Sequence, residues 1–204
     1  MVAAAHAPLP SPTSAAPPDE QRFVLHDVPW QTYVALRDAL DNPGLRMTYH
    51  EGTLELMSPS PEHEVAKTSI ARLIELFALE RDVPLCGYGS TTFRREAKAR
   101  GLEPGECYCL GGPLKELPDI AIEVVLTRGG LDKLPVYSGL GVREVWFWER
   151  DGFHLHALRG EAYEPIATSE LIPELDLDVL ARFVRWPDQH GAAKAFRDWL
   201  RAGR

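Results

Sequence analysis

The sequence contains few cysteines, no long apolar run and no excess of basic residues. Its three cysteines are an odd number and too few for a disulfide framework, which excludes the class of small disulfide-stapled secreted domains. No apolar run approaches the roughly 20 residues that a membrane-spanning helix needs. These absences favour a cytoplasmic protein, and 204 residues are enough to bury a sizeable core in one domain.

Acidic residues outnumber basic ones, with 30 Asp and Glu against 22 Lys and Arg, so the formal net charge is -8. Proteins that bind nucleic acid tightly without sequence preference draw most of their affinity from the neutralisation of phosphates by Lys and Arg. The charge therefore argues against that class. It does not exclude a nuclease, because a cluster of acidic metal ligands is itself negative and a bound cation changes the local balance.

Residues 1–20 are rich in alanine, proline and serine. The stretch lacks a basic start, and its prolines interrupt anything like the apolar region of a signal peptide. This composition predicts a disordered tail rich in polyproline II conformation. We find no internal repeat and no second linker, and so expect a single domain over residues 21–204.

The spacing of apolar residues predicts helices that alternate with strands. Ser60 and Pro61 suit the N-cap and first residue of the longest helix, and Asp151-Gly152 between two apolar runs indicates a hairpin. Helices are expected over residues 30–40, 61–81, 132–138, 175–184 and 190–202. Strands are expected over residues 52–57, 84–87, 90–93, 106–110, 117–126, 142–148, 153–158 and 162–166. The predicted fold class is α/β, of the α+β kind, with a central mixed sheet flanked by helices.

The strand over residues 52–57 alternates Leu54 and Leu56 with Thr53 and Glu55, which is the period of a half-buried strand. The strand over residues 117–126 differs, because both of its faces are largely apolar. Such a strand is typical of the centre of a sheet that is covered on both sides.

Glu123 is an ionisable residue on this central strand, on the same face as Asp119. An unpaired charge in such a place costs several kcal/mol, so Glu123 needs a metal, a Lys or an Arg beside it. A functional carboxylate is one interpretation, because perturbed groups cluster at sites, and a buried ion pair is the other. Asp119 follows Pro118 at the strand entry, where capping is common.

Lys133 lies near the start of the helix that follows the central strand. From there its ammonium group can fold back over the strand end and reach the face of Glu123. A compact point charge suits a phosphate or a metal-bound water. The alternative is a solvated lysine in the first turn of a helix.

Five stretches, in the same order as in the family, resemble the Uma-two family of restriction endonucleases, which belongs to the PD-(D/E)XK superfamily. The resemblance runs from about residue 23 to residue 163, about two-thirds of the chain. The stretches are GTLELMSPSPEHE (52–64), EPGECY (103–108), PDIAIEVV (118–125), LDKLPVY (131–137) and GVREVWFWE (141–149). The resemblance implies a restriction-endonuclease-like core and hydrolysis of DNA that depends on Mg²⁺ or Mn²⁺.

The resemblance also implies roles for individual residues. Glu123 is the acidic residue of the E-x-K element and ligates the metal. The lysine of that element falls on Val125, and the family places its lysine on the following helix, at Lys133. His63 and Glu64 begin the first long helix close to the site, and the helical spacing turns His63 inward, where a core histidine is the alternative.

One position departs from the family pattern. The family has Asp where this chain has Gly105, so the second carboxylate of the metal site is missing. Mg²⁺ usually takes only one or two protein carboxylates, so the loss of one is serious. Glu106 is the preferred substitute ligand, although it points to the opposite face unless a bulge re-aims it. Asp119 is a secondary candidate ligand.

Two other features carry weaker signals. Arg94, Arg95, Lys98 and Arg100 form a basic run that could contact phosphates, or that is a solvated face. Residues 146–148 are three consecutive aromatics, which we expect to lie in the core or at the contact of a homodimer.

These features support three hypotheses. In the first, the protein is a metal-dependent DNA endonuclease in which Glu123, with Glu106 or Asp119, holds the metal and Lys133 orients the nucleophile or stabilises the transition state. In the second, the chain is a catalytically silent DNA-binding or oligomerisation module with the same fold. In the third, it is a structural or protein-interaction domain. Only the third predicts no association with DNA at low salt.

Overall fold

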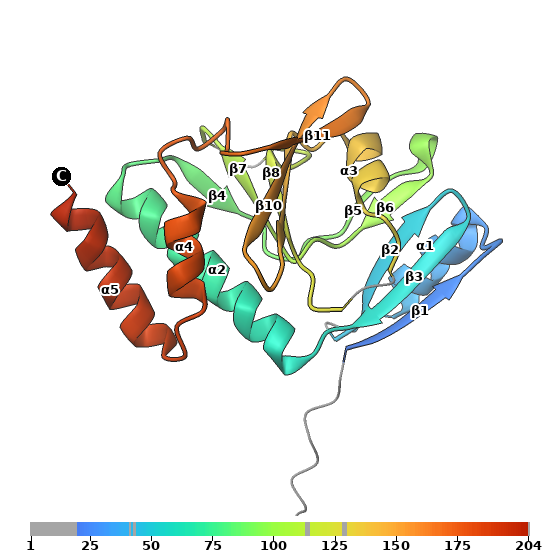
Figure 1. Ribbon diagram of the computed structural model, residues 1–204. Helices are drawn as coiled ribbons and strands as arrows, with labels where there is room; N and C mark the ends of the chain where they lie inside the picture. The colour runs from blue at the N-terminus through green and yellow to red at the C-terminus, as the bar shows by residue number, and fades with distance from the viewer. Residues whose placement is uncertain (1–19, 41, 43, 113–114, 128–129, 204) are drawn as a thin grey trace, which may run out of the picture.

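The computed structural model describes residues 20–40, 42, 44–112, 115–127 and 130–203. Apart from Glu20, the predicted N-terminal tail lies outside the described residues. Two sheets stand side by side, with α1 on the first sheet and α2, α4 and α5 gathered at the other end of the molecule (Figure 1). No helix among the described residues is long and apolar enough to cross a membrane.

The two sheets contain five and six strands. In spatial order, the first sheet consists of β1 (Gln21–Leu25), β3 (Thr53–Ser58), β2 (Arg46–His50), β6 (Arg100–Leu102) and β5 (Phe93–Arg95). The second consists of β11 (Ala162–Ile166), β10 (Phe153–Arg159), β9 (Glu144–Trp148), β8 (Ile120–Val124), β7 (Glu106–Leu110) and β4 (Leu85–Gly87). The helices are α1 (Trp30–Ala39), α2 (Pro61–Glu80), α3 (Leu134–Leu140), α4 (Leu177–Val184) and α5 (Gln189–Ala202), with a 3-10 turn, η1 (Glu96–Lys98).

The predicted mixed sheet is confirmed. Strands β8 and β9 are parallel, and the other pairs of the six-stranded sheet are antiparallel. All five predicted helices are present, and the hairpin of β9 and β10 turns at Asp151-Gly152. The prediction missed β1, β2 and β6, and with them the five-stranded sheet as a separate layer. The strand expected over residues 90–93 is displaced toward the C-terminus, as β5.

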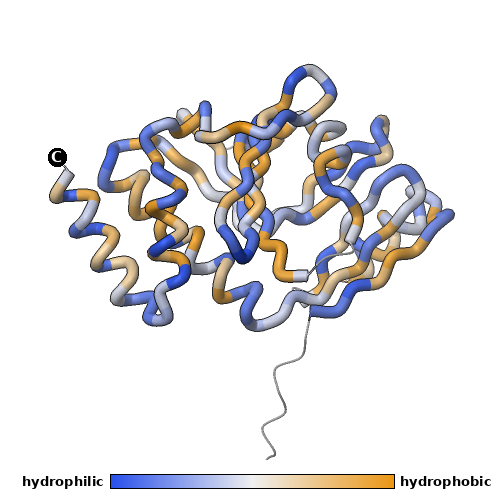
Figure 2. The backbone as a smooth tube through the Cα atoms, viewed as in Figure 1, coloured by the Kyte–Doolittle hydropathy of each residue, from blue (hydrophilic) through white to orange (hydrophobic). Residues whose placement is uncertain are grey.

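Helix α2 begins where the sequence indicates. The Ser60 side chain accepts a hydrogen bond from the backbone N–H of His63 at 3.2 Å, and Pro61 fills the first helical position. One face of the helix packs on the six-stranded sheet beneath α4 and α5, and hydrophobic and hydrophilic residues alternate along these helices (Figure 2). The apolar contacts on this side include Ile70, Leu73, Ile74, Phe77, Ile120, Ile122, Val124 and Trp146.

Helix α3 covers the opposite face of the same sheet. Val136, Tyr137 and Leu140 are buried there in one cluster with Ala121 and Val145. All five residues of β8 are therefore buried, as the two apolar faces of the strand predict. The arrangement places Glu123 on the α3 side, between the six-stranded sheet and the edge of the first sheet.

Candidate functional site

The site is centred on Glu123, whose side chain is on the α3 face of β8 and is 1% exposed as a residue. Its Oε2 accepts a hydrogen bond from Nζ of Lys133 at 2.8 Å, and its Oε1 accepts one from the Tyr137 hydroxyl at 2.6 Å. Lys133 is the N-cap residue of α3, and Tyr137 follows one turn later. The structure thus brings Glu123 and Lys133 together, while their catalytic roles stay predictions.

Tyr137 is a partner of Glu123 that the sequence did not indicate. Burial, together with the neighbouring carboxylate of Glu123, raises the pKa of Tyr137 well above its ordinary value. The hydroxyl therefore stays protonated and donates to Glu123. Its spacing from Lys133, one helical turn, is the one signal that could have identified it.

Gly105 lies opposite Glu123, immediately before the neighbouring strand β7. Glu106 pairs with Ile122 across β7 and β8, so the residue before Glu106 falls opposite Glu123. A Cβ at Gly105 would lie 2.8 Å from the carbonyl oxygen of Ile122, which is closer than real Cβ contacts. The backbone at Gly105 thus lies too close to the β8 backbone to leave room for a side chain. The position where the resemblance expects an acid has neither a carboxylate nor the space for one.

Arg46, on β2, lies next to this position. Its Nη1 would be 3.8 Å from a Cβ at Gly105 and donates to the Pro104 carbonyl at 3.0 Å. Its Nη2 donates to Glu64 Oε1 at 2.8 Å. Arg46 is buried, so a positive charge lies where the family pattern has a negative one.

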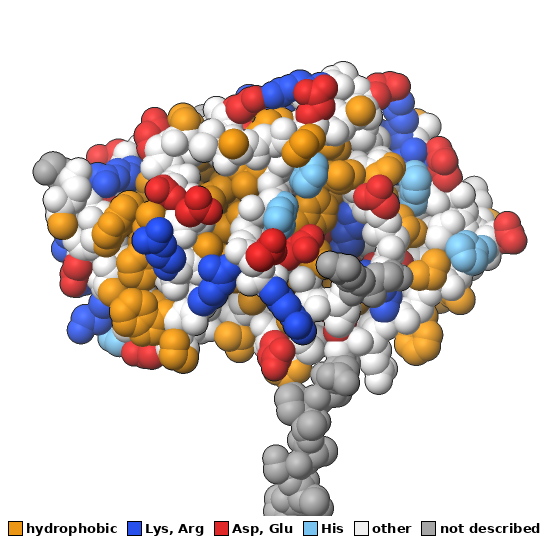
Figure 3. All heavy atoms as spheres, in the orientation of Figure 1, with side chains coloured by type: hydrophobic (Ala, Val, Ile, Leu, Met, Phe, Trp, Pro, Cys, Tyr) orange, Lys and Arg blue, Asp and Glu red, His pale blue; other side chains and the backbone are white. Residues whose placement is uncertain are grey.

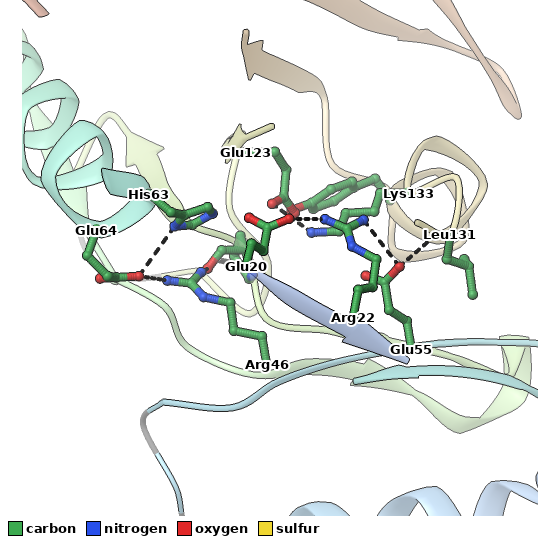
Figure 4. Close-up of polar contacts among 11 residues, drawn as sticks. Glu20, Arg22, Arg46, Glu55, His63, Glu64, Glu123, Leu131 and Lys133 are labelled. Atoms are coloured by element: carbon green, nitrogen blue, oxygen red, sulfur yellow. Dashed lines mark hydrogen bonds and ion pairs between the residues drawn. The ribbon is translucent and has the colours of Figure 1, made fainter. Parts of the chain in front are cut away.

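His63 and Glu64 enter from the first turn of α2 (Figure 4). His63 is fully buried and turned inward, as predicted, and neither of its ring nitrogens has a hydrogen-bond partner among the described residues. Its Nδ1 lies 3.4 Å from Glu64 Oε1, and Lys67 lies 2.5 Å from the other oxygen. The adjacent His63 ring, with Lys67 and Arg46, holds the pKa of Glu64 well below its ordinary value.

The two substitute ligands do not converge on Glu123. Glu106 lies opposite Ile122 and therefore on the α2 face of the sheet, where burial raises its pKa. Asp119 is at the other end of β8. It accepts hydrogen bonds from the Leu110 N–H at 2.8 Å and from Lys115 at 2.5 Å. The geometry gives no support to either residue as a metal ligand shared with Glu123.

Three charged residues that the sequence did not indicate border the site, and we call them the clasp: Glu20, Arg22 and Glu55. Arg22 donates to Glu20 at 2.7 Å and to Glu55 at 3.4 Å. Glu55 also accepts a hydrogen bond from the Leu131 N–H at 2.6 Å, and Glu20 accepts one from Thr127. The clasp therefore links β1 and β3 to the residues around Lys133 (Figure 4).

No signal in the alternation of β3 distinguishes Glu55 from a solvated residue, because it shares a face with Thr53. Its burial, at 1% exposed, depends on β1 and the segment before α3, which are remote in sequence.

An open pocket of about 350 Å³ lies beside the clasp, and its lining includes Arg22, Lys133 and Phe147. A larger hollow of about 580 Å³, between α2 and β4, contains no predicted site residue.

The basic run is largely engaged within the protein. Arg94 forms an ion pair with Asp38 at 3.0 Å, Arg95 donates to the Gly139 carbonyl at 3.3 Å, and Arg100 pairs with Glu51 at 3.0 Å. The face drawn in Figure 3 carries acidic and basic side chains interspersed, with a hydrophobic area over α4 and α5. The interpretation of the run as a phosphate-binding stripe therefore gains no support.

Among the described residues, one group of three side chains has metal-ligand spacing. It consists of Glu149, Asp151 and His154, on the hairpin of β9 and β10. Asp151 and His154 are exposed, and their side chains lie 3.1 Å apart. This group is on the surface and does not include Glu123.

Comparison with known proteins gives two findings. The model of the Uma2 family, described as "Putative restriction endonuclease", matches residues 30–185. A crystal structure of "a putative nuclease belonging to DUF820" from Anabaena variabilis ATCC 29413 is similar over 85% of this chain and 99% of that chain, with 11% sequence identity and a TM-score of 0.46. No curated protein matches the chain.

Proposed function

The chain belongs to the Uma2 family of restriction-endonuclease-like proteins, and from this premise we propose that its Glu123–Lys133 centre binds DNA phosphates and cleaves DNA weakly or not at all. The observation that carries the proposal is the geometry at Glu123. A buried carboxylate holds the lysine that the resemblance assigns to it at 2.8 Å, while the second acid position is a glycine closed against β8.

Restriction-endonuclease-like proteins generally depend on a divalent metal ion. When bound, such a metal activates water and neutralises charge at the phosphoryl group. The described residues do not fit a cage of two carboxylates for it. Both Glu123 oxygens accept hydrogen bonds from the chain itself, Gly105 offers no ligand, and Arg46 adds a positive charge nearby.

What the chain's own residues can do at a phosphate follows from their charge and position. Lys133 and Arg22 both line the open pocket, so two cations face the same space. The Lys133 ammonium is a compact point charge that can contact a phosphate oxygen while it stays near Glu123. Tyr137 orients the Glu123 side chain by its hydrogen bond.

The binding part of the proposal is tested by the salt dependence of DNA association. A duplex oligonucleotide should bind at low salt with an affinity that falls as salt rises. Lys133→Ala should lower the slope of log affinity against log salt by about one, and circular dichroism at the assay temperature checks that the variant, which loses a partner of the buried Glu123, is still folded. No association of the wild-type protein at low salt would overturn the proposal and favour a structural or protein-interaction domain.

A metal-dependent DNA endonuclease is the second candidate, and the retained Glu123–Lys133 pair favours it, because a module that only binds needs no such pair. Plasmid nicking with Mg²⁺ or Mn²⁺ separates the two candidates. Gly105→Asp restores the acid, and Gly105→Ala is the matched control, since it adds the same Cβ against Ile122 without the charge.

Nicking by Gly105→Asp alone would show that the natural chain is a disabled nuclease. Efficient nicking by the wild type would establish the second candidate instead. Absence of nicking in all three proteins, with intact folding by circular dichroism, would leave the chain as a DNA-binding module and remove the catalytic role of the centre.

A further inference from the structure

The clasp joins the first sheet to residues 130–133, the segment that carries Lys133. We propose that Glu55 and Arg22 are positioning residues, which hold this segment so that the Lys133 ammonium reaches Glu123 and the pocket. The inference rests on the proposed function, in which Lys133 contacts a DNA phosphate.

Glu55 is the centre of the clasp. A buried carboxylate is costly unless it is paired and hydrogen-bonded, so its partners are held firmly. Those partners are Arg22, at 3.4 Å, and the backbone N–H of Leu131, at 2.6 Å. Since Leu131 is two residues before Lys133, this hydrogen bond fixes the backbone from which the lysine extends.

Gly130 shows how closely the segment approaches the clasp. A Cβ at Gly130 would lie 2.5 Å from Glu55 Oε2 and closer still to the Arg22 guanidinium. A side chain at this position would therefore displace the ends of the Arg22 and Glu55 side chains from their present positions. The absence of a side chain at Gly130 lets the segment lie directly against the clasp.

The pairing of β1 with β3 explains why Arg22 is available. Arg22 lies opposite Met57 and Val24 lies opposite Glu55, so Arg22 and Glu55 are diagonal neighbours on one face. A long side chain spans that separation easily. Strand β1 lies before residue 30, where the family match begins, so this site residue comes from outside the matched segment.

Substitution of Glu55 separates positioning from simple electrostatics, because the two predict opposite signs. Loss of a negative charge beside Lys133 should strengthen DNA binding if only Coulomb attraction matters. If Glu55 positions Lys133, then Glu55→Ala should weaken binding on the order of tenfold and flatten the salt slope by about one, as Lys133→Ala does. Glu51→Gln is the matched control, since it removes one exposed carboxylate from the adjacent turn.

Combination of the substitutions tests whether Glu55 acts through Lys133. The variant with both Glu55→Ala and Lys133→Ala should bind DNA no more weakly than Lys133→Ala alone, because the positioned group is already absent. Glu55→Gln, which can still accept from the Leu131 N–H, should recover part of the affinity. Additive losses, or stronger binding by Glu55→Ala, would overturn the inference.

Amide hydrogen exchange provides a readout that does not depend on DNA. The Leu131 amide should exchange faster in Glu55→Ala and in Arg22→Ala than in the wild type, with exchange in β8 unchanged. An unchanged Leu131 amide would refute the clasp even if DNA binding is seen. Faster exchange without any DNA binding by the wild type would instead retain the clasp and refute the proposed function.

Discussion

Strand β8 is buried on both sides, yet its two faces use different chemistry. On the α2 side, Ile120, Ile122 and Val124 pack into a hydrophobic cluster. On the α3 side, Glu123 is as deeply buried but is held by hydrogen bonds from Lys133 and Tyr137. The α2 face stabilises the fold in proportion to the apolar area that it removes from water. The contribution of the α3 face depends on hydrogen-bond partners held at the right distances.

The comparison explains how one strand can serve stability and function together. An apolar face tolerates small movements, because dispersion and burial are not directional. A buried polar face does not, since each unpaired group costs the full desolvation penalty. The site can therefore be precise because the other face of the same strand supplies the stability.

The largest effect should come from the apolar face. Ile122→Ala creates a cavity between β8 and α2, and we expect it to lower the free energy of unfolding by about 2–5 kcal/mol. Urea titration followed by circular dichroism measures the change. A loss below 1 kcal/mol, roughly that of an Ile-to-Val change, would contradict the assignment of stability to this face.

A smaller effect should come from the polar face. Glu123→Ala leaves the buried Tyr137 hydroxyl without its acceptor and Lys133 without its carboxylate, so we expect the free energy of unfolding to fall by about 1–3 kcal/mol. Replacement of both partners, as Glu123→Leu with Tyr137→Phe, should recover much of that loss. The same titrations test this, and a double variant less stable than Glu123→Ala would show that packing and not hydrogen bonding governs this face.

The smallest effect concerns Glu106, a carboxylate on the α2 face. Burial, aided by the Glu75 carboxylate, raises its pKa above 4.5 in the folded chain. The folded chain then holds this proton to a higher pH than the unfolded chain does. The contribution of Glu106 to stability is therefore present below the unfolded pKa and is lost as the pH rises through the folded pKa.

Glu106→Gln keeps the neutral shape of the side chain and removes its titration. Its free energy of unfolding relative to the wild type should thus increase as the pH rises from about 4.5 toward neutrality. Unfolding curves at a series of pH values measure the difference. A difference that is constant or that falls with pH would place Glu106 in a solvated or cation-paired setting instead.

The sequence predicted the apolar side of the molecule better than the polar side. The burial of β8, the start of α2 at Ser60 and the hairpin at Asp151-Gly152 follow from local patterns, and the structure confirms them. The approach of Lys133 to Glu123 could be expected because both belong to one strand–helix connection.

The rest of the candidate site depends on contacts between remote segments. Arg46 meets Gly105 because the five-stranded sheet places β2 beside the six-stranded sheet, and Arg22 meets Glu55 because β1 pairs with β3 within the five-stranded sheet. That sheet was not predicted as a layer, since its short strands carry weak alternation. From the sequence alone, the buried charged residues of this sheet therefore cannot be distinguished from charged residues exposed to solvent.

Strand β1 is the edge of its sheet, and its two faces differ. Phe23 lies opposite Leu56 and Leu25 lies opposite Leu54, on the face of the α1 cluster, yet the two side chains are 62% and 44% exposed. On the other face, Arg22 is turned toward Glu55. A slip of the strand by one residue would exchange the two faces and separate Arg22 from Glu55. Burial of apolar side chains therefore fixes the alignment of β1 only weakly, and the ion pairs of Arg22 with Glu20 and Glu55 give the strand a register that its exposed apolar residues do not.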